Sequence, residues 1–196
     1  MTVLAEPLAI AARVGRGFDA LEIPWLLGGS VASSLHGLPR FTQDVDLVAD
    51  LRLVHVLPLV ADLEVEFYID ADSVRDAIRR RASFNLIHLA TMTKVDVFLL
   101  KGDALSRGEM ARRVRLTFAE GVEISIATAE DIILQKLDWY RKGEFVSERQ
   151  WRDVLGVIKV RGAALDLSWL RETSAEVGLE GLLEEALQAA DRPGAP

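Results

Sequence analysis

Two aspartates, Asp44 and Asp46, lie two residues apart in an otherwise apolar stretch of the chain. In a β-strand, residues i and i+2 point to the same face, so the two carboxylates would lie side by side while Val45, Leu47 and Ala49 face the core. Neighbouring like charges repel each other unless a cation or strong hydrogen-bond donors lie between them. The pair therefore indicates either the solvated end of a strand or a cation site.

A third aspartate, Asp96, lies inside the strongly apolar segment 94–100, where strand alternation gives it a face shared with Lys94 and Phe98. An acid in such a strand needs a partner or a metal ion. If this segment pairs with residues 43–49, three carboxylates converge, and oxygen ligands of this kind suit Mg²⁺ or Mn²⁺. Two such ions about 4 Å apart are the usual arrangement for in-line displacement at phosphorus.

A glycine-serine turn, Gly28, Gly29 and Ser30, follows a short apolar strand and opens a helix. Glycine lets the backbone come close to a phosphate, and a helix N-terminus supplies N–H donors with a partial positive charge. Residues 31–43 separate this turn from Asp44. The turn, the spacer and the aspartate pair together predict a phosphate site beside a metal site.

This combined pattern resembles the nucleotidyltransferase superfamily with the polymerase-beta-like fold. Its signature is an apolar-Gly-Gly/Ser turn, a spacer of similar length and an Asp-x-Asp/Glu strand, matched here by segments 27–30 and 44–47. The segment 37–44, GLPRFTQD, is similar to the minimal bacterial branch of AbiEii-type toxins. That branch also implies a helical lysine, matched by Lys136, and an aspartate in an Arg-rich segment, matched by Asp153.

The resemblance implies a reaction in which a nucleoside monophosphate moves from an NTP to an acceptor hydroxyl with the help of Mg²⁺ or Mn²⁺. Its acceptor would be an RNA, such as the 3′ end of tRNA, or a protein, and an antitoxin would be the cognate partner. Gly29 and Ser30 would hold the β- and γ-phosphates, and Asp44 and Asp46 would hold the metal. Asp96, with a second ion, would help to deprotonate the acceptor.

Four further residues receive roles around this site. Helical spacing places Lys136 on an apolar face, which indicates a phosphate or carboxylate partner. Arg40 would neutralise phosphate charge, and Thr42 would orient the turn before the strand. Asp153 would either lie half-buried between the two modules, where it would contact the nucleotide or orient Lys136 or an arginine, or be a solvated acid.

Three other functions fit parts of the pattern. The same chemistry could use a small-molecule acceptor, as in antibiotic nucleotidyltransferases, and the net charge of −7 is compatible with a cationic acceptor. A nucleotide-binding protein with a weakened site is another class, but the intact set of three aspartates argues against it. A purely structural domain would leave the buried carboxylates unexplained.

The elements that position these residues predict an α+β fold with a mixed sheet and flanking helices over residues 1–127. A helical module over 128–190 and a disordered tail over 191–196 follow. Strands are expected at 25–27, 45–49, 65–69, 85–89, 94–100, 114–118 and 122–126. Helices are expected at 5–20, 31–36, 51–62, 72–81, 103–112, 128–141, 147–160, 166–177 and 179–189.

The composition narrows the function classes further. The chain has no cysteine, which excludes disulfide-linked partners and thiol chemistry and fits a cytoplasmic protein. Its three histidines are not in metal-ligand spacing, so a zinc site is not expected. No apolar run is long enough to span a membrane, and we expect no secretory signal and no membrane partner.

Overall fold

A computed structural model describes residues 4–42, 44–119 and 122–192 of the chain. The chain forms two compact units. The sheet unit comprises the residues up to Val31 together with Phe41–Ala127, and the helical unit comprises Ala32–Arg40 and the chain from Thr128 onward. The segment Ala32–Arg40 thus groups with the C-terminal helices, although it lies among the strands in the sequence.

The sheet unit contains a mixed sheet whose described strands run in the order β3-β4-β5-β2-β1-β7-β6. Pairing is antiparallel except between β1 and β7 and between β2 and β5. The strands are β1 (Trp25–Leu27), β2 (Asp44–Ala49), β3 (Phe67–Tyr68), β4 (Ser83–His88), β5 (Lys94–Leu99), β6 (Val114–Ala119) and β7 (Val122–Ile126).

The two central strands, β2 and β5, are amphipathic in the way that their sequences predict. Val45, Leu47, Val95 and Val97 are completely buried, and the residues between them are only partly buried. One face of the strand pair therefore packs into the core, and the aspartates share the opposite face. This alternation fixes the register, because a slip of one residue would turn the carboxylates into the core.

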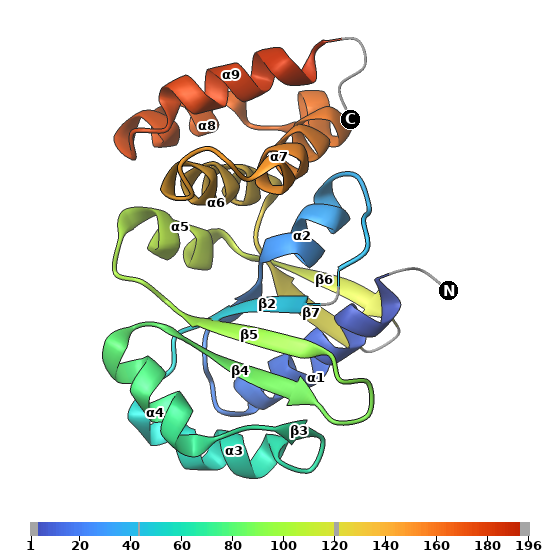
Figure 1. The fold of residues 1–196 in the computed structure, drawn as a ribbon, viewed down its shortest axis with the longest axis vertical. Helices are drawn as coiled ribbons and strands as arrows, with labels where there is room; N and C mark the ends of the chain where they lie inside the picture. The colour runs from blue at the N-terminus through green and yellow to red at the C-terminus, as the bar shows by residue number, and fades with distance from the viewer. Residues whose placement is uncertain (1–3, 43, 120–121, 193–196) are drawn as a thin grey trace. The chain divides into compact units, whose positions relative to one another are not determined.

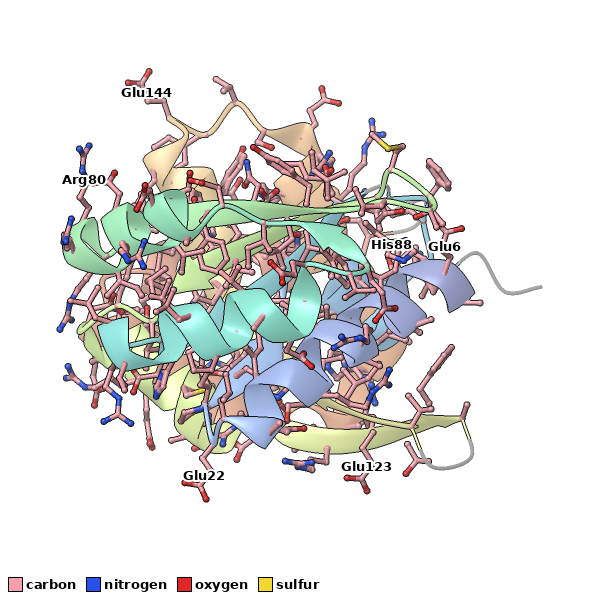
Figure 2. All side chains as sticks on the ribbon, turned by 90° about the horizontal axis from the view of Figure 1, so that it is seen from below. Glu6, Glu22, Arg80, His88, Glu123 and Glu144 are labelled. Atoms are coloured by element: carbon pink, nitrogen blue, oxygen red, sulfur yellow. The ribbon has the colours of Figure 1, made fainter. Side chains whose placement is uncertain are left out.

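Helices α1, α3 and α4 lie together on one face of the sheet (Figures 1 and 2). Asp70 caps α4 by accepting a hydrogen bond from the Ser73 N–H, and Asp103 caps α5 through the Ser106 N–H in the same way. The helical elements of this unit are α1 (Ala5–Ala20), η1 (Leu53–His55), α3 (Val56–Leu63), α4 (Ala71–Arg80) and α5 (Ala104–Arg112).

The helical unit contains the end of α2 (Gly29–His36), which starts in the sheet unit, and the four C-terminal helices. Thr128 and Ser147 cap α6 and α7 by accepting hydrogen bonds from backbone N–H groups three residues later. The elements after Thr128 are α6 (Ala129–Lys142), α7 (Glu148–Arg161), η2 (Gly162–Ala164), α8 (Leu167–Glu176) and α9 (Glu180–Ala190).

Four predicted elements differ from the structure by two or more residues at one end, and one of them is the expected strand 85–89, which is β4 (Ser83–His88). The expected helix 51–62 is split into the 3₁₀ turn η1 and α3, and the expected strand 65–69 shortens to β3 (Phe67–Tyr68). Helix α2 begins at Gly29 rather than at Val31, which places the glycine-serine turn in its first turn. Of the predicted tail, residues 193–196 lie outside the described residues.

None of the described helices combines the length and the apolar character that crossing a bilayer requires.

Candidate active site

The carboxylates predicted to act together lie on adjacent strands of the sheet unit. Strands β2 and β5 pair in parallel, with Asp46 opposite Asp96 and Asp44 opposite Lys94. Because residues i and i+2 share a face, all four side chains emerge on the same side of these two strands. The segment with Asp96 therefore pairs with the segment of Asp44 and Asp46, which is the pairing that the convergence of the three carboxylates requires.

The Asp46 carboxylate is tied to the start of α2. Its Oδ2 atom accepts a hydrogen bond from the Ser30 N–H at 3.3 Å. A carboxylate is favoured at a helix N-terminus, because the unpaired N–H groups there carry a partial positive charge. The glycine-serine turn and the aspartate pair thus form one local structure, although a thirteen-residue spacer separates Ser30 from Asp44 in the sequence.

The two glycines of the turn have different roles. The Gly28 N–H donates to the Asp46 carbonyl at 2.9 Å, which extends the pairing of β1 with β2, and a Cβ atom there would meet only Leu26 at 3.8 Å. Gly29 has a positive φ of 56°, and a Cβ atom there would overlap the Asp46 carboxylate. Only Gly29 is therefore required for the close approach of the turn to Asp46.

We expect Gly29→Ala to displace the Asp46 carboxylate and to strain the backbone, because alanine in the left-handed region costs about 1–2 kcal/mol. This cost corresponds to a fall in Tm of about 3–6 °C for a chain of this size. A Cβ atom at position 28 would make only an ordinary van der Waals contact. Gly28→Ala should therefore change Tm by less than about 2 °C. Differential scanning calorimetry of both variants measures the contrast, and equal losses would show that the turn tolerates no side chain at either position.

Asp96 is paired with Lys94 on its own strand. The Lys94 Nζ atom lies 2.8 Å from Asp96 Oδ1 and 2.9 Å from Oδ2, so one ammonium group contacts both carboxylate oxygens. The hydrogen bond to Asp96 raises the pKa of Lys94 above its ordinary value. Burial opposes this shift, and the charges of Asp96, Asp44 and Asp46 add to it. Lys94 is therefore a cation at neutral pH.

The carboxylate set has the chemistry of a magnesium site, but its side chains do not form a closed cage. Within residues 4–42, 44–119 and 122–192, no three acidic or histidine side chains come close enough to hold a metal ion. Asp46 is turned to the α2 N-terminus and Asp96 to Lys94. Mg²⁺ is commonly held by one or two carboxylates together with substrate phosphates, so Asp44 and Asp46 fit such an ion.

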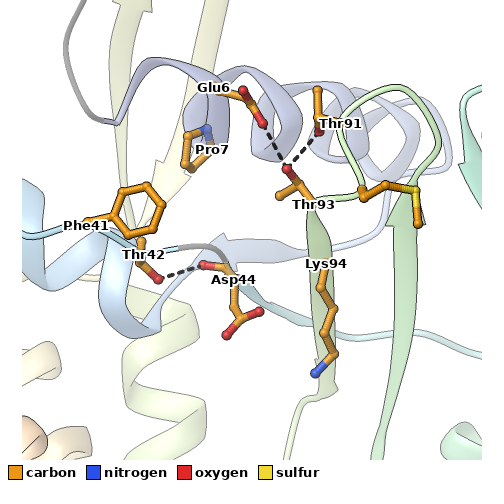
Figure 3. A pocket seen from close by; sticks show the side chains of 9 residues that line it. Glu6, Pro7, Phe41, Thr42, Asp44, Thr91, Thr93 and Lys94 are labelled. Carbon is orange, nitrogen blue, oxygen red and sulfur yellow. Dashed lines mark hydrogen bonds between the residues drawn. The ribbon is translucent and has the colours of Figure 1, made fainter.

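A pocket of about 420 Å³ opens beside Asp44 in the sheet unit (Figure 3). Its polar wall is a chain of hydrogen bonds, in which His88 Nδ1 contacts the Thr91 hydroxyl at 2.9 Å and Thr91 contacts Thr93 at 2.7 Å. Thr93 in turn donates to Glu6 at 2.9 Å, so these hydrogen bonds link His88 to Glu6, both labelled in Figure 2. The lining residues are Glu6, Pro7, Phe41, Thr42, Asp44, Thr91, Met92, Thr93 and Lys94.

Thr42 orients the start of β2. Its hydroxyl donates to the Asp44 carbonyl at 3.2 Å, and the side chain is buried (Figure 3). This contact holds the residue that begins the carboxylate strand, and the wider role of Thr42 in the site stays a prediction.

The other predicted site residues lie in the helical unit, where Asp153 is the centre of a buried ion-pair network. Arg40 contacts both Asp153 oxygens, with Nε 2.8 Å from Oδ1 and a terminal nitrogen 3.1 Å from Oδ2. The Lys136 Nζ atom lies 2.7 Å from Asp153 Oδ2 and 3.0 Å from the Gln150 side-chain oxygen. The carboxylate partner expected for the inward-facing Lys136 is therefore Asp153.

The charge state of Asp153 follows from these contacts. Burial by itself would raise the pKa of the carboxyl, but hydrogen bonding to Arg40 and the charge of Lys136 outweigh it, and the pKa lies below its ordinary value. Only 7% of the Asp153 side chain and 6% of the Lys136 side chain are exposed. Asp153 thus holds the segment containing Arg40 to helices α6 and α7.

Two features of the site were missed by sequence reasoning. Lys94 was placed on the face of Asp96 without a role, although the alternation in KVDVFL puts an ammonium beside the acid. No sequence pattern marks Glu6 as a pocket residue, because its contact with Thr93 joins residues 87 positions apart. No local pattern reveals a contact of that kind.

Comparisons with solved structures place this arrangement in a known fold. No protein-family model and no curated protein matches the chain. A nucleotidyltransferase-like protein from Paracoccidioides brasiliensis is 18% identical with a TM-score of 0.54, covering 94% of this chain and 93% of its own. The protein ANT(2″)-Ia, in a complex with adenylyl-2″-tobramycin, is 14% identical with a TM-score of 0.55. The match covers 87% of this chain and 98% of that protein.

A candidate nucleotidyltransferase from Thermotoga maritima is 13% identical with a TM-score of 0.51, and the match covers 77% of this chain and 95% of that protein. At these identities the likeness concerns the fold. The chain therefore has the nucleotidyltransferase-like α+β fold with flanking helices, and this confirms the fold that the sequence predicts.

Proposed function

We propose that this chain transfers a nucleoside monophosphate from an NTP to a hydroxyl group of a small, amine-bearing acceptor, with the help of Mg²⁺ or Mn²⁺. The observation that carries the proposal is the joint placement of Gly29, Ser30 and Asp46 at the start of α2, beside Asp44 and Asp96 on paired strands. The nucleotidyltransferase-like fold supports the same reaction class.

The transfer would be a single in-line displacement at the α-phosphorus. The acceptor oxygen forms a bond to phosphorus, the bond from phosphorus to the α–β bridging oxygen breaks, and pyrophosphate leaves with that electron pair. The acceptor proton passes to the Asp96 carboxylate, on the strand next to Asp46. The remaining task of the protein is to position the reactants and to stabilise their charge, as is typical of chemistry at phosphorus.

Asp44 and Asp46 would hold the metal ion together with the triphosphate, because hard cations prefer carboxylate and phosphate oxygens. A bound ion of this kind neutralises phosphate charge and polarises the reacting phosphoryl group. The N–H groups at the start of α2 and the Ser30 hydroxyl would contact the phosphates. Charge neutralisation by Arg40 and Lys136 stays a prediction from the sequence.

The pocket beside Asp44 favours a small acceptor over a macromolecular one. Its volume of about 420 Å³ is within the range of small-molecule sites. Among the described lining residues, Glu6 and Asp44 give it two carboxylates, and the ammonium of Lys94, the only cationic residue of that set, contacts Asp96. An aromatic ring, Phe41, completes a lining that suits a cation. A compound with amino and hydroxyl groups fits this chemistry.

The AbiEii-type alternative keeps the transfer reaction but assigns it to an RNA or protein acceptor, with an antitoxin as partner. It rests on the similarity of segment 37–44 to that toxin branch. A macromolecular acceptor is therefore kept as a separate arm of the experiment below.

The test is incubation of the purified chain with Mg²⁺ and each α-labelled NTP, in separate reactions with tobramycin, total cellular RNA and total cellular protein. We expect label on tobramycin, the acceptor seen with ANT(2″)-Ia. Glu6→Gln should then raise the KM for tobramycin about ten-fold with little change in kcat, because a charged hydrogen bond worth about 1.5 kcal/mol is lost. Glu22→Gln, at an exposed position after α1 (Figure 2), is the matched control.

The arms of this experiment separate the two parts of the proposal. Label on RNA or on a protein, with none on tobramycin, would support the transfer reaction and overturn the small-acceptor assignment. No labelled product and no labelled pyrophosphate exchange with any NTP would overturn the transfer reaction itself.

A further inference from the structure

The carboxylate face of β2 and β5 contains a cation of its own. In the parallel register, Asp44 lies opposite Lys94 and Asp46 lies opposite Asp96, so three acids and one lysine form a four-residue cluster on one face. The formal charge of the three carboxylates is balanced by one divalent ion together with one ammonium group. A second divalent ion at these residues would leave an excess of positive charge before any nucleotide binds.

Lys94 occupies the position that such a second ion would need. Its Nζ atom contacts both oxygens of Asp96, at 2.8 and 2.9 Å. A magnesium ion binds its oxygen ligands at about 2.0–2.1 Å, so an ion on the same oxygens would lie against the ammonium group and be repelled by it. The Asp96 side chain is 16% exposed and the Lys94 side chain 44%, so Asp96 is mostly shielded from solvent and Lys94 is its charged partner on this face.

We propose that Lys94 supplies the cation at Asp96, so that the site takes a single divalent ion, held by Asp44 and Asp46. This inference rests on the proposed nucleotide transfer and departs from the two-ion arrangement that the sequence predicts. In this role Lys94 is a positioning residue. It holds the Asp96 carboxylate in one orientation on β5 and leaves the metal ion on β2.

The count of bound ions tests the proposal without any turnover. Each variant is dialysed to equilibrium against Mn²⁺ and a non-hydrolysable α,β-methylene NTP, with the four bases in parallel, and the excess Mn²⁺ per chain is measured. We expect one Mn²⁺ per wild-type chain. Lys94→Met should bind two Mn²⁺ per chain, because Asp96 loses its ammonium partner. The second Mn²⁺ should bind this variant at least about ten-fold more tightly than any second Mn²⁺ binds the wild-type chain.

Two further variants distinguish charge from structure. Lys94→Arg keeps the positive charge and should bind one Mn²⁺, and Lys94→Gln should behave like Lys94→Met if the methionine variant folds poorly. Lys159→Met removes one lysine from the helical unit and should bind one Mn²⁺, which controls for the change in net charge. Circular dichroism and Tm confirm that each variant is folded.

Two outcomes would overturn the role of Lys94, namely two Mn²⁺ per wild-type chain or a single Mn²⁺ in both the wild type and Lys94→Met. Failure of the wild type to bind Mn²⁺ with any of the four analogues would instead overturn the proposed nucleotide site, and the inference with it. The two failures are therefore distinguishable.

Discussion

Asp46→Asn is expected to lower the rate of nucleotide transfer by about a thousand-fold while the chain stays folded. Asparagine keeps the shape of the side chain and an oxygen that can accept the Ser30 N–H. It removes the negative charge that would hold a divalent ion beside the triphosphate. Loss of several kcal/mol of charge stabilisation in the transition state corresponds to a factor of this size.

The measurement is incorporation of α-labelled nucleotide under single-turnover conditions, with Tm recorded for the same samples. Asp50→Asn is the matched control, because Asp50 is an exposed carboxylate immediately after the same strand. Its activity should equal that of the wild type. Retained transfer by Asp46→Asn, with an unchanged dependence on Mg²⁺, would remove Asp46 from the metal site.

The carboxylate face was predictable because it depends on local alternation. Asp44, Asp46 and Asp96 stand in short apolar segments, and a strand is the conformation that buries the valines of those segments while turning the acids to one side. The presence of a helix after β1 was predictable for a similar reason, since glycine and serine after a strand indicate a turn into a helix, although α2 begins two residues earlier than expected. Both patterns can be recognised from a few neighbouring residues of the sequence.

The contacts that give these residues partners could not be predicted in this way. Gly28 and Gly29 look equivalent in the sequence, but the backbone N–H of Gly28 belongs to the sheet while Gly29 faces the Asp46 carboxylate. The pairing of Arg40 with Asp153 joins residues 113 positions apart. It groups the loop after α2 with the C-terminal helices, and no local pattern marks this grouping.

Asp153→Asn is expected to lower the stability of the chain more than any exposed charge substitution. It replaces a carboxylate that accepts from both Arg40 and Lys136, and Lys136 is almost completely buried. Removing one member of a buried ion pair leaves its partners uncompensated, at a cost of about 3 kcal/mol. For a chain of this size, the corresponding fall in Tm is about 6–12 °C.

Glu148→Gln provides the matched control on the same helix. It breaks the ion pair of Glu148 with Arg152, in which both side chains are largely exposed. Exposed pairs contribute little, so Tm should fall by no more than about 2 °C. Equal Tm values for Asp153→Asn and the wild type would mean that the Arg40 and Lys136 contacts do not stabilise the helical unit.

The pH dependence of this difference tests the charge of Asp153 directly. Because the pKa of Asp153 is lowered in the folded chain, the carboxylate stabilises the fold at every pH above the ordinary aspartate pKa of about 3.9. This stabilisation is lost as the pH falls through the lowered pKa of the folded state. Urea unfolding at pH 7 should therefore show the full difference between wild type and Asp153→Asn, and the difference should shrink below about pH 4. A difference that stays constant down to acid unfolding would instead indicate that the asparagine disturbs packing, since a packing defect does not titrate with this carboxyl.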